Sequence, residues 1–496
     1  MSDSMKMFSW YTVSGVLLGV PFVVPALWVC GLIGVAVFVY ATTIAKAPGA
    51  VLLGGFVAWM VKSLFALSFG WSIWPIESFL FTLPLSGFWV IAMYWISGSV
   101  FLGTGGAFVA GWLWYTWTHK KYETLALLTL PVLWLLGEFL AARLFSVLTI
   151  GPDGFYTAAF SYGQLGYILA EHNLLILLAK LGGVYVLTVI AAMMGVMFWY
   201  GYQKLAPTKR SLAGVGAVIV LIVSGFVPVS TGEVMGAGLK IAVVDTEFNN
   251  QIIRSLDEIT QREVLLGEAI EVAIANGVTH IILPEGSRFN DAQQSVGALA
   301  RRLRFLTADA TVVLVDSGRA ELNAVDTALR ATVYDGVTKE AWQVDKQYLV
   351  PQGEYVPVYF GELFKLVGMG ERVAEVGKVF DFVPGPLRDQ SVLPAGMPRI
   401  LFCHSSADPV AIRRLLADGA EVPFIAHPIS HAWFGGSQVL KDQQTAMLRI
   451  QALWNDIAIV SAGNKTRGEL YAKNGEVRIP IEVGSGEGWT VSVIDL

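Results

Sequence analysis

The sequence has few charged residues and few cysteines, and both shortages limit what kind of protein it encodes. Asp, Glu, Lys and Arg make up 15% of the 496 residues, whereas 54% are hydrophobic. About a quarter of the residues of an ordinary soluble domain are charged, so the composition excludes a fully soluble chain. Cysteine occurs only at Cys30, inside an apolar run, and at Cys403. We therefore expect no structural disulfide.

Basic tracts and clustered histidines are also missing. The net charge is −5, and no run of Lys and Arg resembles a phosphate-binding patch, so we expect no nucleic-acid partner. The six histidines are scattered without the spacing of metal ligands, and we predict neither a metal nor a cofactor. The glycine-rich stretches at 103–108 and 182–187 lie inside apolar runs and indicate close helix packing.

Long apolar runs fill residues 1–231. A helix that crosses a bilayer needs about 20 mostly apolar residues, and about seven runs meet this length. They are residues 8–25, 27–45, 50–72, 87–117, 124–147, 174–200 and 211–230. The N-terminal part therefore predicts a transmembrane helical bundle, with the first run retained as an anchor and not removed as a signal peptide.

Lys and Arg in alternate loops predict the orientation of this bundle. Basic residues occur near the N-terminus and after the second, fourth and sixth runs, whereas the loop at 71–87 has none. Because basic loops stay in the cytoplasm, we expect a cytoplasmic N-terminus and a soluble half that lies outside. Three charged residues fall inside the runs, Glu138, Arg143 and Lys180. Such groups face protein or a water-filled cavity, or extend toward the ends of their spans.

From residue 238 the composition becomes that of a soluble α/β domain, so we place a domain boundary between 231 and 238. Short apolar runs alternate with amphipathic helices, which predicts helices that cover a sheet. Strands are expected at 239–248, 280–286, 310–318, 399–403, 422–430 and 457–464, and helices at 256–276, 292–306, 410–418 and 437–455. Hairpin patterns at 323–350 and 469–494 indicate that the sheet is mixed.

Three polar residues lie beside predicted strands of this domain. Glu285 ends the strand "HIILPEG", Lys346 precedes another strand, and Cys403 ends "RILFC". A cysteine attacks as its thiolate, a glutamate can accept the thiol proton, and an ammonium stabilises an oxyanion. Together they would carry out acyl transfer through a thioester. The bland alternatives are a buried apolar cysteine, a solvated glutamate and a surface lysine.

The stretches "LPEGSRF", "DKQYLVPQGEYVP" and "ILFCHSSADP" resemble the Glu, Lys and Cys motifs of the carbon–nitrogen hydrolase (nitrilase) superfamily. "LVPQGEYVP" is most similar to bacterial apolipoprotein N-acyltransferases, and "LLGEFLAARLF" and "LLAKLGGVYVLT" resemble their membrane spans. The resemblance implies a nitrilase-like domain over 238–496, built as an α-β-β-α sandwich, on the extracytoplasmic side of a bacterial inner membrane.

The same resemblance implies roles for four residues. Cys403 would be the nucleophile, Glu285 the general base, Lys346 the oxyanion stabiliser and Glu354 an additional supporting glutamate. The acyl donor would be a phospholipid of the membrane, and the acceptor would be the N-terminal amine of a lipoprotein or a similar amine.

The sequence departs from the family around these motifs. His404 and Ser405 replace an aromatic and an acidic residue, Gln352 replaces an aromatic residue, and Asn464 retains only part of a late motif. His404 would act on the thiol or pack in a turn. Two other functions stay open: an amidase or hydrolase in which water or a small amine resolves the thioester, and a non-catalytic membrane protein of conjugal transfer with the same fold.

Overall fold

A computed structural model describes residues 3–74, 84–118, 122–155, 160–204, 238–249, 255–289, 311–323, 326–351, 353–366, 368–378, 382–386, 390 and 392–496. The chain forms two compact units. Residues 1–150, 158–230 and 437–454 belong to unit 1, and residues 151–157, 231–436 and 455–496 belong to unit 2. The predicted boundary between 231 and 238 lies outside the described residues.

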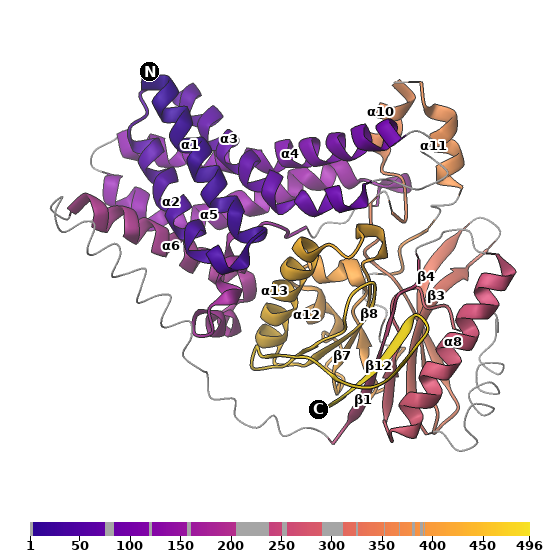
Figure 1. The fold of residues 1–496 in the computed structure, drawn as a ribbon. Helices are drawn as coiled ribbons and strands as arrows, with labels where there is room; N and C mark the ends of the chain where they lie inside the picture. Colours follow the sequence, from indigo (N-terminus) through magenta and orange to yellow (C-terminus); the bar gives the residue numbers. More distant parts are fainter. Residues whose placement is uncertain are drawn as a thin grey trace. The chain divides into compact units, whose positions relative to one another are not determined.

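Unit 1 is a bundle of apolar helices (Figure 1). Its long helices are α1 (Asp3–Gly19), α2 (Trp28–Thr43), α3 (Pro48–Ala66), α4 (Pro84–Thr118), α5 (Glu123–Phe145) and α6 (Gly183–Lys204). Among the described residues, five helices are long and apolar enough to cross a membrane. The predicted count of about seven is therefore not confirmed: α1 has 17 residues, and the run at 211–230 lies outside the described part of the chain.

The sixth predicted span is wrong at its start. The apolar run begins at residue 174, but residues Leu165–Glu171 and Leu175–Leu181 form the 3-10 segments η7 and η8. The α-helix begins only at Gly183, which has a φ of +61°. A backbone in this left-handed region favours glycine, and it separates η8 from α6. The sequence is apolar on both sides of this break, so composition alone did not show where the α-helix begins.

Glycines bring α3 and α4 into close contact, as the glycine-rich stretch predicted. A Cβ built on Gly106 would lie 2.2 Å from the carbonyl oxygen of Gly55, and one built on Gly55 would lie 2.4 Å from the carbonyl oxygen of Gly106. The two backbones therefore touch at a point where no larger residue fits, the packing expected of helices within a membrane.

Helix α13 (Gln438–Asn455) lies between strands of unit 2 in the chain but packs with unit 1. Gln443 donates from Nε2 to the carbonyl oxygen of Ala66 at 2.8 Å. Arg449 donates to the carbonyl oxygen of Ala170 at 2.7 Å, and the Trp454 ring meets that of Tyr185 edge-on. The helix predicted at 437–455 thus exists, and its partners include the ends of membrane helices.

Unit 2 contains a mixed sheet of 12 strands (Figure 1). Parallel pairs join β1 (Lys240–Thr246) to β2 (His280–Ile282) and β8 (Ile459–Asn464), β2 to β3 (Val313–Glu321), and β7 (Ile425–Ser430) to β6 (Arg399–Ile400) and β8. Antiparallel pairs join β3 to β4 (Thr327–Asp335), β4 to β5 (Ala341–Asp345), β8 to β9 (Leu470–Tyr471), and β9 to β10 (Val477–Arg478). The predicted mixed sheet is confirmed.

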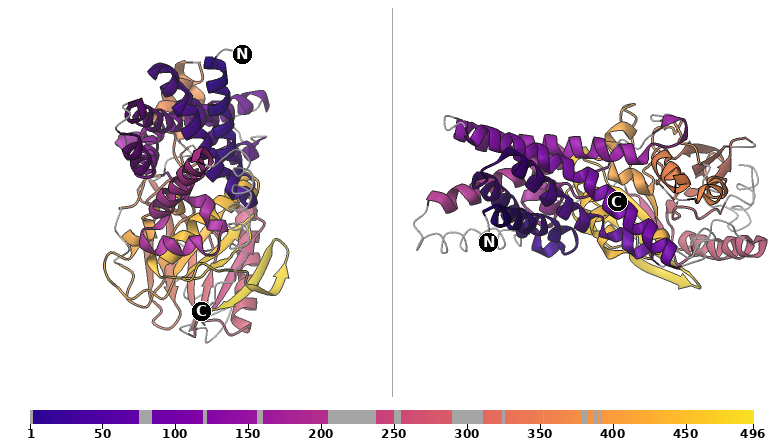
Figure 2. Two further views of the ribbon diagram at one scale, coloured as in Figure 1. Left: turned by 90° about the vertical axis from the view of Figure 1, so that its left-hand side faces the viewer. Right: turned by 90° about the horizontal axis from the view of Figure 1, so that it is seen from above.

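The last two strands of unit 2 form a hairpin at a border of its sheet. Strand β12 (Trp489–Asp495) pairs antiparallel with both β1 and β11 (Ile481–Gly486). Figure 2 shows this yellow hairpin reaching beyond the neighbouring strands. The exposed pattern of β11 agrees with an edge strand, so the hairpin forms a border of the sheet.

Helix α8 (Leu256–Ala275) covers one face of the sheet (Figure 1). A capping box begins it: Ser255 Oγ accepts a hydrogen bond from the Glu258 backbone nitrogen, and the Glu258 carboxylate accepts one from the Ser255 backbone nitrogen. This arrangement satisfies helix donors that would otherwise be unpaired. Leu266 and Ile270 then pack with β1 residues such as Val244. The amphipathic pattern thus predicted this helix and its buried face.

The remaining described helices of unit 2 are short. They are α10 (Val358–Leu366), α11 (Gly370–Gly377), α12 (Ala411–Leu415) and the 3-10 segments η6 (Pro152–Gly154), η10 (Cys403–Ala407) and η11 (Ala432–Phe434). The helix predicted at 292–306 lies outside the described residues. The strand expected at 399–403 is only two residues long, so Cys403 opens a turn and does not end the strand. The α-β-β-α sandwich stays a prediction.

Candidate active site

Glu285 lies in a hydrogen-bonded loop and does not end a strand as predicted, because β2 stops at Ile282. The Glu285 backbone nitrogen donates to the carbonyl oxygen of Ile429 on β7 at 3.3 Å. The next residue, Gly286, donates to Ser317 Oγ on β3 at 3.0 Å. Arg288, with a φ of +58°, donates from its backbone to the carbonyl oxygen of Ser317 at 2.9 Å. Neighbouring strands therefore fix where the Glu285 carboxylate points.

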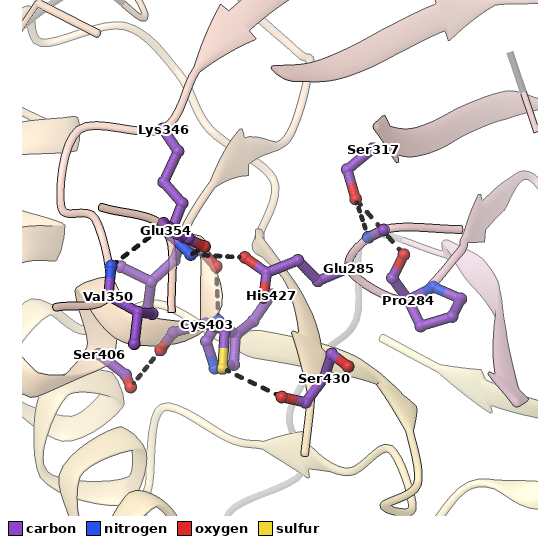
Figure 3. Close-up of polar contacts among 12 residues, drawn as sticks. Pro284, Glu285, Ser317, Lys346, Val350, Glu354, Cys403, Ser406, His427 and Ser430 are labelled. Carbon is purple, nitrogen blue, oxygen red and sulfur yellow. Dashed lines mark hydrogen bonds and ion pairs between the residues drawn. The ribbon is translucent and has the colours of Figure 1, made fainter. Parts of the chain in front are cut away.

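Lys346 follows β5 and lies at the centre of the site (Figure 3). Its backbone nitrogen donates to the carbonyl oxygen of Leu329 on β4 at 2.7 Å. The Nζ atom lies 3.0 Å from Glu285 Oε1 and 2.6 Å from Glu354 Oε1, and the side chain is 0% exposed. A buried ammonium needs such partners, so the lysine is held between two carboxylates.

Glu354 is held by a turn of its own. Its backbone nitrogen donates to the carbonyl oxygen of Val350 at 2.9 Å. Its Oε2 atom accepts a hydrogen bond from the Val350 backbone nitrogen at 2.8 Å, while Oε1 binds Lys346. Both carboxylate oxygens therefore have donors, which hold the side chain in place.

Cys403 completes the group. Its backbone N–H hydrogen-bonds the Glu285 carboxylate, and its Sγ atom lies 4.0 Å from the carbonyl oxygen of Ser430 at the end of β7. Ser406 Oγ donates to the Cys403 carbonyl oxygen at 2.7 Å. The structure thus brings together all four predicted residues, as Figure 3 shows.

The electrostatics of the site favour a base and a permanent cation. Burial raises the pKa of Glu285, the positive charge of Lys346 lowers it, and the negative charge of Glu354 raises it, so the net shift is upward. Burial lowers the pKa of Lys346, but Glu285, Glu354 and Cys403 outweigh it, so the net shift is also upward. Glu285 is therefore a stronger proton acceptor than an ordinary glutamate, and Lys346 stays charged.

Two histidines near the thiol remain neutral at neutral pH. Burial and the positive charge of Lys346 lower the pKa of His404 to about 3. The pKa of His427 falls to about 4, mainly because the ring is buried, although its hydrogen bond to the Leu401 carbonyl oxygen opposes the shift. His404 cannot therefore supply a positive charge to the thiolate. Ser405 is buried in the same turn.

Sequence reasoning missed Ser317 and Ser430, two residues that support this group, although it singled out Asn464. Ser317 binds the loop of Glu285, and the Ser430 carbonyl oxygen lies 4.0 Å from the thiol sulfur. Asn464, at the end of β8, donates from Nδ2 to Ser430 Oγ at 3.3 Å and accepts from Thr246 Oγ1 at 3.0 Å. Polar residues inside otherwise apolar strands were the available signal, but their partners depend on how the strands pair.

A half-buried thiol, two carboxylates and a buried ammonium are the kinds of group that chemistry through a thioester requires. Acyl transfer through a cysteine is therefore the chemistry that these side chains can support.

Comparison with known proteins identifies relatives of this chain. No protein-family model matches the chain. It is 23% identical over 370 residues to an apolipoprotein N-acyltransferase of Geobacter metallireducens, covering 71% of this chain and 65% of that one. An apolipoprotein N-acyltransferase of Neisseria meningitidis serogroup B is 24% identical over 350 residues, covering 66% and 61%. The chain is a divergent relative of these proteins and matches less than two thirds of their length.

Solved structures similar to the chain include an amidase from Nesterenkonia sp. AN1. One structure has a TM-score of 0.35 and 18% identity, covering 54% of this chain and 93% of that chain. A second, described as an amidase from the nitrilase superfamily, has a TM-score of 0.35 and 20% identity over 53% and 91%.

Proposed function

We propose that the protein is a membrane-bound N-acyltransferase that moves a fatty acyl chain from a phospholipid to an amine through a thioester at Cys403. The observation that carries the proposal is the Lys346 ammonium held 3.0 Å from Glu285 and 2.6 Å from Glu354, beside the only cysteine of unit 2. The apolar helices and the names of the relatives support a membrane lipid as donor.

In the first step Glu285 accepts the proton of the Cys403 thiol. The thiolate attacks the carbonyl carbon of a phospholipid ester, and Lys346 stabilises the oxyanion that forms. The intermediate collapses with cleavage of the bond between the carbonyl carbon and the ester oxygen. The lysophospholipid leaves with the proton that Glu285 returns, and the acyl chain remains on sulfur.

In the second step a neutral amine attacks the thioester carbon. Lys346 again stabilises the oxyanion, and Glu285 takes the proton that the amine loses. The carbon–sulfur bond breaks, an amide is released, and the proton returns to the Cys403 sulfur. Glu354 neutralises the buried ammonium throughout, so that Lys346 keeps its position while Glu285 gains and loses a proton.

The acceptor would be the N-terminal amine of a lipoprotein, since that is the substrate that the names of the relatives imply. The predicted orientation places the site on the extracytoplasmic side of a bacterial inner membrane, where such an acceptor and outer-leaflet lipids are both available.

Intact-mass spectrometry of the protein purified from membranes tests the thioester. We expect a fatty-acyl adduct that hydroxylamine releases and that is absent from the Cys403→Ala variant. Cys30→Ala is the matched control, because it removes the other thiol, which lies within α2, and should leave the adduct intact.

An adduct that survives in Cys403→Ala, or a wild-type thiol that stays unmodified after incubation with phospholipid, would contradict the proposal. An adduct that water but no amine resolves would replace the transferase by a hydrolase.

A further inference from the structure

Arg414, on helix α12, joins the two segments that carry the thiol and the ammonium of the site. Its Nη1 atom donates to Asp408 Oδ2 and to the hydroxyl oxygen of Tyr348. Asp408 directly follows η10, the turn that Cys403 opens. Tyr348 is the second residue after Lys346. One guanidinium nitrogen therefore connects the thiol segment, residues 403–408, to the lysine segment, residues 346–354.

Both partners of Arg414 are buried, whereas the arginine itself reaches the surface. Tyr348 is 6% exposed, and the Asp408 side chain is 3% exposed, against 38% for Arg414. The guanidinium carbon also lies 5.9 Å from the centre of the Tyr348 ring, within reach of a cation–π contact. Ser405 of η10 lines the same recess as Tyr348 and Arg414, so the two segments face each other there.

Asp408 is fixed to the turn on one side and to α12 on the other. Its backbone nitrogen donates to the Ser405 carbonyl oxygen at 3.1 Å, and its carbonyl oxygen accepts from the Ala411 nitrogen at 3.1 Å. Its Oδ1 atom accepts from the Val410 nitrogen at 3.1 Å. A force on the Asp408 carboxylate is therefore passed to the turn that holds Cys403.

Tyr348 lies inside a loop that is closed by the charged groups of the lysine segment. Lys346 precedes it, and Glu354 follows it and binds the Lys346 ammonium through Oε1 at 2.6 Å. The other carboxylate oxygen of Glu354 accepts from the Val350 nitrogen at 2.8 Å. A contact at Tyr348 therefore holds the ammonium and its carboxylate together.

We propose that Arg414 is a positioning residue that sets the distance between the Cys403 sulfur and the Lys346 ammonium. The inference rests on the roles proposed above for these two groups. The ammonium stabilises an oxyanion only when it lies within hydrogen-bond distance of the developing charge, and a small misalignment of reacting groups slows a reaction strongly. Arg414 acts on this alignment through Asp408 and Tyr348.

Acylation of Cys403, followed by mass spectrometry over a range of phospholipid concentrations, tests this role. Arg414→Gln and Tyr348→Phe should each lower the rate at saturating lipid about tenfold. The half-saturating lipid concentration should stay the same, because the variants change alignment and not lipid binding. Arg413→Gln is the matched control: it removes an exposed cation one residue earlier on α12 and should leave the rate unchanged.

Two further variants separate positioning from folding. Arg414→Lys should recover part of the rate lost in Arg414→Gln, because Nη1 alone makes both contacts and an ammonium has three donors. Adding Tyr348→Phe to Arg414→Gln should slow acylation no further, since the connection is already broken. Unfolding midpoints establish that each variant is folded.

Alkylation of Cys403 by iodoacetamide, in the Cys30→Ala background, gives a second readout that needs no acyl transfer. The thiolate is the reactive form and a nearby ammonium favours it, so Arg414→Gln and Tyr348→Phe should slow alkylation by similar factors. If the wild-type thiol is alkylated but never acylated, the proposed function fails, whereas this comparison still tests the positioning.

Wild-type rates in both assays for Tyr348→Phe would overturn the proposal, because Arg414 would then stabilise only its own turn. Losses that multiply in the double variant would also contradict it. A raised half-saturating lipid concentration at an unchanged saturating rate would assign Arg414 to lipid binding and not to positioning.

Discussion

Lys346 and Glu354 form an ion pair in which Nζ and Oε1 are 2.6 Å apart, while the Glu354 side chain is 13% exposed. The same distance separates Lys365 from Glu362, but those side chains are 56% and 62% exposed. Exposed pairs contribute little, whereas removing one partner of a buried pair leaves a charge without compensation. The two pairs therefore form a matched test of what burial adds.

Glu354→Gln should slow acylation of Cys403 by about 100-fold, because the lysine would lose one of its two carboxylates and bind Glu285 more tightly, making that carboxylate a poorer base. Glu362→Gln should leave the rate unchanged. The rate is measured as the appearance of the acyl adduct by mass spectrometry. Equal rates in the two variants would show that Glu354 has no part in the reaction.

As the pH is lowered, the reactivity of Cys403 should begin to fall at a pH above that at which an ordinary glutamate is protonated. Glu285 has a raised pKa, and once protonated it cannot accept the thiol proton. On acidification, Glu285 is therefore protonated at a higher pH than an exposed glutamate would be. Alkylation by iodoacetamide measures this in the Cys30→Ala background, where only Cys403 remains.

Glu285→Gln should abolish that acid limb and lower the reactivity above it. A limb that persists unchanged in this variant would mean that another group, and not Glu285, controls the thiol.

Within unit 1, Lys62 and Glu138 form a buried pair of 3.4 Å, with side chains 5% and 3% exposed. Glu138 also accepts hydrogen bonds from the Leu165 backbone at 2.8 Å and from Thr188 at 3.3 Å. Glu138→Ala should destabilise the bundle by about 3–5 kcal/mol, because it leaves the buried Lys62 ammonium without a counter-charge. Thermal unfolding in detergent measures the loss.

The double variant Lys62→Met with Glu138→Leu should recover part of that stability, since neither charge is then buried alone. Additive losses in the double variant would contradict the pairing.

Gly106→Ala should separate α3 from α4, because its Cβ would lie 2.2 Å from the Gly55 carbonyl oxygen and 2.5 Å from the Trp59 ring. We expect a loss of about 1–3 kcal/mol. Gly201→Ala is the control: nothing lies within 4 Å of its Cβ, and alanine favours a helix by up to about 1 kcal/mol. Unfolding midpoints that move together in the two variants would count against close packing.

Local patterns predicted most elements of the soluble part, including α8 and the paired strands of both hairpins. The resemblance of their motifs to a known family, and not a local pattern, placed Glu285, Lys346, Glu354 and Cys403 in one site. Ser317 and Ser430 escaped prediction because their partners lie on other strands, and strand register is not encoded in a local pattern. The start of the sixth span was wrong because hydropathy does not distinguish an α-helix from a 3-10 segment.

The amphipathic pattern of residues 437–455 likewise predicted a helix with one buried face but could not name what buries it. Gln443, Arg449 and Trp454 give the answer, since all three contact unit 1. This partner is hundreds of residues away in sequence, and only the folded chain reveals it.

Helix α13 interrupts the soluble unit between β7 and β8, whose ends carry Ser430 and Asn464. Proteolysis at a single linker near residue 238 would therefore leave the two units joined, because the polypeptide returns to the bundle and leaves it again. Residues 238–496 expressed alone would present the bundle-facing side of α13 to water. The two units therefore exchange chain segments, so no single cut in the sequence separates one from the other.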